Sequence, residues 1–264
     1  MYENLAKAGI NMDKQTFLST YNFTEDDLIR ADITWEELGL IYYNYKRLER
    51  DLRDIVKNFI DDYLYEIDAA GIHSYRYRIK DADNLLEKVV RKKLENPEKF
   101  AMLDHTNYYK FVTDLIGIRV LFLYREDWVH FHKYLTGIFE NNPDLYITDR
   151  LADFDENPDH YYLAERPRAY KRTGDTKIYD GKEIDIITDG IYRSLHYIVK
   201  YKGHYIEIQG RTLFEEGWSE IDHDIVYKSG LNDEMLEDYS RMLNRLSGLA
   251  DEMSSYFRRI KDRQ

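Results

Sequence analysis

The carboxylate of Glu207 is the first candidate for chemistry in this chain. It stands between Ile206 and Ile208, in a segment that alternates apolar and polar residues. In a β-strand the isoleucines would face the core, and Glu207 would share the opposite face with Gln209 and Arg211. Removing an ionised carboxylate from water is costly unless an arginine, a cation or water compensates it. The segment is therefore either a solvent-facing edge strand or part of a site.

A second carboxylate, Asp114, interrupts the most apolar segment of the chain. Residues 111–124 are rich in β-branched and aromatic side chains and predict a central strand that is buried on both faces. Near the start of a strand an aspartate ordinarily forms a turn or a cap, but beside a cation-binding cleft it can be a metal ligand. Asp114 and Glu207 on separate strands would suit Mg²⁺, which takes oxygen ligands from one or two carboxylates, from phosphates and from water.

The positive charge of this acidic chain is concentrated in two places. The formal net charge of −12 opposes indiscriminate binding to nucleic acid or to anionic membranes. The first cluster lies on a predicted strand, 73–80, and on the exposed face of the helix that follows it. The second lies in 148–191, which predicts a long loop with one short hairpin at most. Each cluster is either a solvated face or a cradle for polyphosphate. The cations are Arg76, Arg78, Lys80, Lys88, Arg91, Lys92 and Lys93 in the first cluster, and Arg166, Arg168, Lys171, Arg172 and Lys177 in the second.

Other elements would frame these clusters. Thr34 and Glu37 predict a capping box at the start of a long amphipathic helix. Segments 192–201 and 204–211 predict an antiparallel hairpin, which would bring Tyr192, Ser194 or His196 close to Glu207 or Gln209. A last helix carries an apolar stripe that is either core or the binding face for a partner helix. The stripe consists of Met235, Leu236, Tyr239, Met242, Leu243, Leu246, Leu249, Met253 and Phe257.

The composition limits the classes of function. A length of 264 residues with 43% hydrophobic residues supports a sizeable core. The absence of cysteine excludes disulfides and thiolate metal sites and fits a reducing cytoplasm. No run of about 18 apolar residues and no secretory leader are present, so we expect a cytoplasmic protein that does not span a membrane.

The order of these residues resembles the synthetase domain of the RelA/SpoT family, the alarmone synthetases that move pyrophosphate from ATP to the 3′-hydroxyl of GDP or GTP. The resemblance runs from Arg76 to Lys228. Its motifs are Arg78-Ile79-Lys80 with Lys88 and Arg91 downstream, DLIGIR (114–119), YRSLHY (192–197), EIQGRT (207–212) and WSEIDH (218–223).

The resemblance implies an α+β fold similar to that of nucleotidyltransferases, with a mixed sheet of about five strands flanked by helices. We expect a single synthetase domain over 1–264, with a helical extension (1–70), a catalytic core (71–228) and a C-terminal helix (229–264). Family members that also hydrolyse alarmones carry an N-terminal domain with a His-Asp pair. Because residues 1–70 contain no histidine, we expect a protein that only synthesises.

The resemblance also implies roles for single residues. Asp114 and Glu207 would bind Mg²⁺, and Glu207 would complete that site or take the proton from the acceptor hydroxyl. Arg78 and Lys80 would act with them in catalysis, and Tyr192 would stack on the acceptor base. The implied ATP-binding residues are Arg78, Lys80, Lys88, Arg91 and Arg119, and the implied acceptor-binding residues are Tyr192, Arg193, His196, Gln209, Arg211, Lys171 and Arg172.

The identity of the acceptor stays open at this point. Relatives usually have Asn-Gly before the stacking tyrosine, whereas Gly190 and Ile191 precede it here. The stretch 214–223 looks more like the toxic and phage-defence branch, some members of which pyrophosphorylate the 3′ end of tRNA. Basic strips at 46–53 and 76–93 would then contact the tRNA. A catalytically silent nucleotide sensor is the third alternative, and a homo-oligomer or an antitoxin protein is a possible partner.

Overall fold

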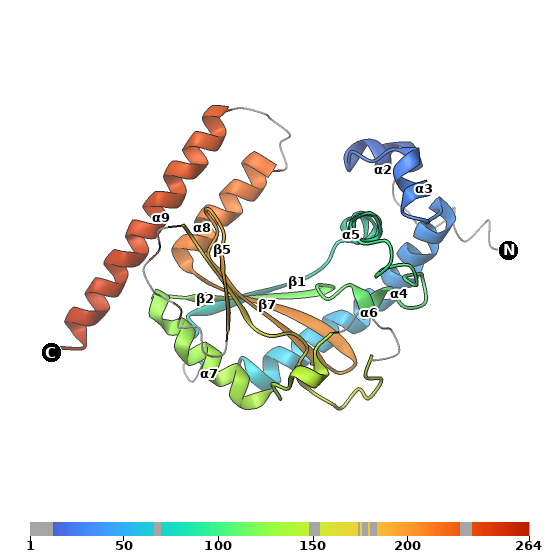
Figure 1. The fold of residues 1–264 in the computed structure, drawn as a ribbon. Coiled ribbons are helices and arrows are strands. Elements are labelled where there is room, and N and C mark those ends of the chain that lie inside the picture. The colour runs from blue at the N-terminus through green and yellow to red at the C-terminus, as the bar shows by residue number, and fades with distance from the viewer. Residues whose placement is uncertain are drawn as a thin grey trace.

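The computed structural model describes residues 13–65, 70–147, 154–173, 175, 179, 184–227 and 234–263. These residues form one mixed sheet with helices on both sides (Figure 1). No helix among them combines the length and apolar character needed to cross a bilayer. The strands are β1 (Ser74–Ile79), β2 (Ile116–Phe122), β3 (Tyr162–Leu163), β4 (Arg168–Lys171), β5 (Asp185–Thr188), β6 (Ser194–Tyr201) and β7 (His204–Thr212). The helices are α2 (Lys14–Thr20), α3 (Glu25–Arg30), α4 (Trp35–Tyr63), α5 (Ala82–Glu95), α6 (Tyr108–Phe111), α7 (Trp128–Ile138), α8 (Leu213–Ile221) and α9 (Glu234–Lys261).

The strand order is β1-β2-β7-β6-β4-β5, and β3 pairs with β6. Strands β2 and β7 are parallel, whereas β6 and β7 form the predicted antiparallel hairpin. Its turn residues Lys202 and Gly203 have φ values of 48° and 75°, and positive φ at both central residues is what a tight hairpin turn requires. The predicted α+β class is confirmed, with more strands than expected.

The additional strands come from the polar region 148–191. The prediction of a long loop there is wrong for its described part, because β3, β4 and β5 pair with β6 or with each other. These strands are two to four residues long. They are stabilised by pairing with the rest of the sheet, so their own sequences show no sustained alternation. The predicted long loop over 166–177 is therefore partly a sheet strand, and Lys177 lies outside the described residues.

The register places polar residues of four strands on one face of the sheet. Arg78 pairs with Gly117, and Gly117 pairs with Glu207. Two residues further along β2 and β7, Arg119 pairs with Gln209, and Gln209 also pairs with His196 of β6. Directly paired residues point to the same side of a sheet. The residues singled out from the sequence therefore share one surface, which we call the site face.

The opposite face of the sheet belongs to the core. Ile118, Tyr197 and Ile208 are almost completely buried there, beside the fully buried Phe59 of α4 and Phe131 of α7. In Figure 1, α4 and α7 lie below the strands, whereas α8 lies above them and α9 runs past their left edge. Burial of each such large apolar side chain contributes about 1.5–3 kcal/mol to folding. The core helices thus fix the sheet and leave its other face for the site.

Two local predictions need correction. The hydroxyl of Thr34 accepts a hydrogen bond from the Glu37 amide (3.1 Å) as predicted, but the Glu37 carboxylate accepts one from the His105 amide (2.7 Å). The reciprocal half of the predicted capping box is therefore absent. Lys93 was expected to be exposed, but it is buried, and its ammonium donates to the carbonyls of Phe100 (3.1 Å) and Ala101 (3.3 Å). A long lysine stem can be buried when backbone carbonyls satisfy its ammonium group.

Helix α9 packs against the protein through a few small or polar residues and leaves most of its large apolar side chains exposed. Its buried residues are small or polar, whereas the large apolar side chains that the sequence grouped in one stripe are mostly exposed. The interpretation of this stripe as core is wrong, and that of a binding face for a partner helix stays a prediction. The buried residues of α9 are Asn244, Ser247, Gly248, Asp251 and Ser255.

Candidate active site

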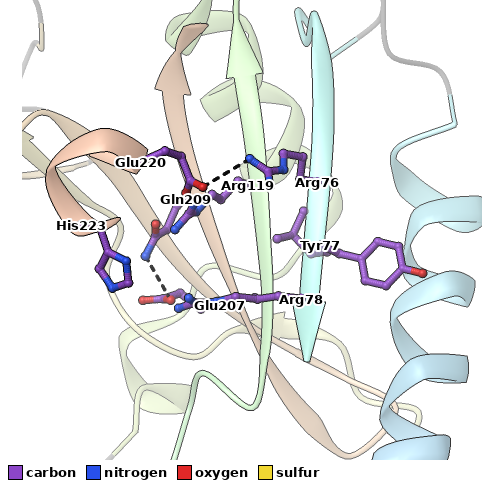
Figure 2. Close-up of a pocket in the computed structure, with 10 residues that line it drawn as sticks. Arg76, Tyr77, Arg78, Arg119, Glu207, Gln209, Glu220 and His223 are labelled. Carbon is purple, nitrogen blue, oxygen red and sulfur yellow. Dashed lines mark hydrogen bonds and ion pairs between the residues drawn. The ribbon is translucent and has the colours of Figure 1, made fainter. Parts of the chain in front are cut away.

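A cavity opens on the site face above β1, β2 and β7 (Figure 2). Its volume of about 210 Å³ is below the roughly 300–1,000 Å³ of pockets that enclose a whole drug-sized ligand. It can therefore hold one part of a larger substrate, such as a nucleobase. Tyr77 points away from the other labelled side chains in Figure 2, as strand alternation requires. The charged or polar side chains around the cavity include Arg76, Arg78, Arg119, Glu207, Gln209, Glu220 and His223.

Three arginines on two neighbouring strands form the cationic part of this cavity: Arg76 and Arg78 of β1 and Arg119 of β2. The Arg119 guanidinium donates to Glu216 (2.9 Å) and also bonds to Glu220, both of which belong to α8. Arg78 lies across Gly117, where an added Cβ would come within 3.4 Å of the Arg78 side chain. Held guanidinium groups present flat faces on which an aromatic base can stack. The polar face of α8 thus supports the site.

Next to this cavity, Asp114 binds two lysines. Its Oδ2 lies 2.9 Å from the ammonium of Lys80 and 2.7 Å from that of Lys88. Burial alone would raise the pKa of Asp114, but the two lysines outweigh it and lower this pKa to about 2. Conversely, burial lowers the pKa of Lys80 despite the carboxylate. The three residues form a partly buried group with a net positive charge, which suits phosphate oxygens.

The other oxygen of Asp114 is available for a metal ion. Asp114 Oδ1 is buried, and no hydrogen bond reaches it. A buried carboxylate oxygen without a partner is uncommon in native proteins and requires an explanation. Divalent magnesium prefers oxygen ligands of this kind, so the residues present fit the ion that the family resemblance implies.

Glu207 lies on β7 with partners that keep it ionised. Gln209 Nε2 donates to its Oε2 (3.1 Å), and His196 Nδ1 lies 3.6 Å from its Oε1. Burial would raise the pKa of Glu207, but His196 and Lys88 outweigh it, although the negative charge of Asp114 acts in the opposite direction. The net result is a pKa below the ordinary value, so Glu207 is a carboxylate at neutral pH. It can accept a proton or bind a cation.

A third group gathers around Arg211 at the far end of β7. Its guanidinium donates to the Tyr192 hydroxyl (2.5 Å), to Gln209 Oε1 (3.0 Å) and to Ser219 Oγ (2.6 Å). The Tyr192 hydroxyl also lies 3.2 Å from His196 Nε2. Arg211 is buried, so it positions Tyr192 and Gln209 and leaves few donors for a ligand.

One aromatic residue of this group escaped the sequence interpretation. Tyr170 on β4 packs edge-on against Tyr192 and His196, with ring centroids 5.6 and 4.8 Å away. It was missed because β4 was predicted as loop. Its neighbour Lys171, which was predicted to bind the acceptor, lies on the opposite side of β4 by strand alternation.

Three further cations predicted to bind substrate have partners within the protein. Arg91 pairs with Glu87 (2.8 Å) and Glu95 (3.2 Å) of its own helix. Arg172 and Arg193 are buried in an ionic cluster behind Tyr192, and their carboxylate partners are Asp175, Glu215 and Asp251. We therefore leave these three arginines out of the substrate contacts proposed below.

The buried ionic cluster should make stability depend on pH near neutrality. Burial is the main cause that raises the pKa of Asp251 to about 7, and Glu215 adds to it, whereas Thr212 and Arg193 oppose it. This pKa is above the ordinary value of 3.8. The contribution of Asp251 to the free energy of unfolding is therefore fully present below pH 3.8, and it is lost as pH rises through about 7.

We expect the free energy of unfolding to fall by about 1.4 kcal/mol between roughly pH 6 and pH 8. The Asp251→Asn variant should lack this decline, because asparagine does not titrate. Urea unfolding across this pH range would measure both proteins. An equal decline in the variant would assign the effect to another group.

The comparisons with known proteins agree with the fold. The family model described as "Region found in RelA / SpoT proteins" matches residues 77–232, more than half of the chain. No match was found among the curated proteins.

Solved structures with a similar fold include the small alarmone synthetase 1 of Bacillus subtilis. It is 20% identical, with a TM-score of 0.51, and the match covers 84% of this chain and 95% of that one. A GTP pyrophosphokinase family protein of Streptococcus pneumoniae is 18% identical, with 94% of each chain covered and a TM-score of 0.46. The family match and the mixed sheet that carries its motifs show that this chain belongs to the RelA/SpoT family.

Proposed function

We propose that the protein is a cytoplasmic ATP-dependent pyrophosphokinase that transfers the β,γ-diphosphate of ATP to the 3′-hydroxyl of GDP or GTP and makes a (p)ppGpp-type alarmone. The observation that carries the proposal is that three groups share one face of the sheet. An arginine-lined cavity can take a base, the adjacent Lys80-Lys88-Asp114 group can take phosphates, and the Glu207 carboxylate in the cavity wall can take the proton of the acceptor hydroxyl.

The ATP base would enter the cavity between Arg78 and Arg119. Glu216 and Glu220 fix the plane of Arg119, so little side-chain entropy is lost when a base stacks on it. The triphosphate would then run toward Lys80 and Lys88. Their ammonium groups offset the charge of the phosphate oxygens, as cations do in other phosphoryl transfers.

Magnesium would be held by Asp114, with Glu207 as the second candidate ligand. When bound, the ion neutralises phosphate charge and helps to fix the direction of attack. Lys80 and Lys88 keep Asp114 ionised down to a low pH, so its free Oδ1 is a competent ligand at physiological pH. Glu207 is on β7, and Asp114 lies in the turn two residues before β2, so the sheet limits the movement of both carboxylates.

The acceptor would bind on the β6 side of Glu207, with its base stacked on Tyr192. Its 3′-hydroxyl attacks the β-phosphorus of ATP while the bond to the α–β bridging oxygen breaks, AMP leaves, and the hydroxyl proton passes to Glu207. His196 and Gln209 contact the two oxygens of the Glu207 carboxylate. These contacts fix the orientation of the carboxylate before the substrate binds.

A tRNA 3′ end is the alternative acceptor, and the structure offers it less support. On α4, Lys46 and Arg53 pair with Glu49, at 2.6 and 3.9 Å. The basic strip that the sequence indicated at 46–53 is thus partly neutralised by its own helix. A tRNA footprint requires several cations that can pair with phosphates, so we favour the free nucleotide.

The acceptor is tested directly by supplying the protein with Mg²⁺, γ-labelled ATP and either GDP, GTP or deacylated tRNA. We expect the label on GDP or GTP. If only tRNA became labelled, the acceptor would be the tRNA 3′ end and not a free nucleotide. Transfer to none of the three acceptors would contradict both enzymatic hypotheses and would favour a nucleotide sensor.

The Tyr192→Ala variant should raise the KM for the acceptor about tenfold and leave the KM for ATP nearly unchanged. Loss of base stacking costs about 1–3 kcal/mol, and Tyr192 lies at the acceptor end of the site. Steady-state kinetics with each substrate varied in turn would show the difference. Tyr65→Ala is the matched control, because Tyr65 is highly exposed on another part of the surface. Equal effects on both KM values would contradict the stacking role.

A further inference from the structure

The exposed stripe of α9 has the spacing of a coiled-coil seam. From Met235 to Ile260 eight of its large apolar residues follow one another at alternating steps of four and three, and each of the eight is between 53 and 64% exposed. Such a strict repeat keeps an apolar seam facing a partner helix over several turns. Soluble proteins rarely expose a continuous apolar strip of this length without a partner. The seam residues are Met235, Tyr239, Met242, Leu246, Leu249, Met253, Tyr256 and Ile260.

In the described parts of the chain, more than half of the surface of each seam residue from Tyr239 to Ile260 is exposed. Helix α8 packs against the other side of α9, where Trp218 donates to the Ser240 carbonyl (3.1 Å). Asn244 donates to the Ile191 carbonyl (2.9 Å), and Asp251 pairs with Arg193 (3.0 Å). Figure 1 shows α9 along one edge of the molecule. The polar side of α9 therefore attaches it to the protein, and the apolar side faces outward.

The charged residues beside the seam indicate which partner fits. In heptad terms the g positions are Asp238, Arg245, Glu252 and Arg259, all of them exposed. Their charges alternate in sign along the helix. In coiled coils the residues at e and g set the choice and the orientation of the partner. This pattern of signs can therefore be tested against a second copy of the same helix.

An antiparallel second copy of α9 can cover the apolar seam and pair the charges beside it in the same register. When Leu246 meets Leu249 of the partner subunit across the two-fold axis, Met242 meets the partner's Met253. The same register sets Asp238 beside the partner's Arg259 and Arg245 beside the partner's Glu252. Each of these pairs occurs twice by symmetry. All the g positions thus find opposite charges without a change of register.

A parallel copy gives no such match. It would set each g residue against an e residue of the partner, and the e positions here are Leu236, Leu243, Ala250 and Phe257. The four charges would then lie against apolar side chains. We propose that α9 pairs with α9 of a second copy of this chain as an antiparallel coiled coil, which makes the protein a two-fold symmetric dimer.

The orientation can be tested by crosslinking, because the natural chain has no cysteine. Under mild oxidation the double variant Met242→Cys/Met253→Cys should form a covalent dimer, whereas either single variant should not. In the antiparallel register two copies of residue 242 are separated by about 16 Å along the helix, beyond the roughly 7 Å that a disulfide can span. Crosslinking of a single variant would indicate a parallel pair, and no crosslinking of the double variant would also overturn the proposal.

The charges can be tested by sedimentation of unmodified and variant proteins over a range of concentrations. We expect a mass of twice 31.9 kDa for the natural chain, and a wild-type monomer at every concentration would overturn the proposal. Arg245→Glu should weaken association about tenfold, since two attractive pairs become repulsive.

Arg245→Glu combined with Glu252→Arg should restore association, because the exchanged charges face each other again. Lys261→Glu is the control, with the same change of charge on α9 but away from the seam. Equal weakening by the control, or no rescue by the double variant, would contradict the assigned register. Circular dichroism checks that α9 stays folded in each variant.

Discussion

Replacement of Glu207 by glutamine is expected to lower kcat by about a thousandfold, while the dissociation constant for ATP changes by less than about threefold. Glutamine preserves the shape of the side chain and removes its charge. A positioned general base typically contributes a factor of about 10²–10⁴, and a thousandfold loss is about 4 kcal/mol of barrier. In the proposed binding mode the arginines of β1 and β2 hold the ATP base, so the binding of ATP should persist.

Single-turnover transfer and equilibrium binding of ATP would measure the two effects of Glu207→Gln separately. Glu49→Gln is the matched control, because Glu49 makes only local ion pairs on the surface of α4. If Glu207→Gln kept kcat within about tenfold of wild type, or roughly 1.4 kcal/mol, Glu207 would be a structural residue. A large loss of ATP affinity with unchanged kcat would instead place it in the ATP-binding contacts.

The Asp114→Asn variant is expected to lose both activity and stability. Activity should fall by at least about a hundredfold, because the amide is a poor ligand for Mg²⁺. The pKa of Asp114 is lowered from 3.8 to about 2, which corresponds to roughly 2 kcal/mol of stability. The variant also leaves Lys80 and Lys88 without their shared counter-charge.

The pH dependence of this stability difference follows from the lowered pKa. The contribution of Asp114 is present above pH 3.8 and is lost as pH falls through about 2. Urea unfolding should therefore show wild type more stable than Asp114→Asn at pH 7 and a shrinking difference in acid. Adding Lys88→Met to the variant should restore part of the stability, because one unpaired cation is removed. Equal stability of wild type and variant at pH 7 would contradict this account of the lysine pair.

The parts of the site that could be predicted from the sequence are those encoded locally. The alternation around Glu207 and the turn at Lys202-Gly203 determine the hairpin, and its register alone brings His196 to Glu207. The buried segment that follows Asp114 determines the neighbouring strand. Family motifs then supplied the roles that alternation cannot assign.

The remainder depends on contacts between distant parts of the chain. Arg193 follows Tyr192 directly in a family motif, yet it points into a buried cluster because Asp251, 58 residues later, lies behind it. Strand β4, which carries Tyr170, is stabilised by its pairing with β6, and its own sequence does not predict that pairing. The small and polar residues of α9 repeat at helical spacing, and this pattern could have shown that its apolar stripe faces outward.

The most direct test of the central claim is to identify what becomes of ATP. With Mg²⁺ and GDP, we predict that each turnover releases one AMP and adds both the β- and the γ-phosphate of the same ATP to the acceptor as a unit. ATP labelled separately at the β and γ positions, with separation of the nucleotide products, would measure this stoichiometry. Release of ADP, or transfer of the γ-label without the β-label, would contradict the claim that this site transfers a diphosphate.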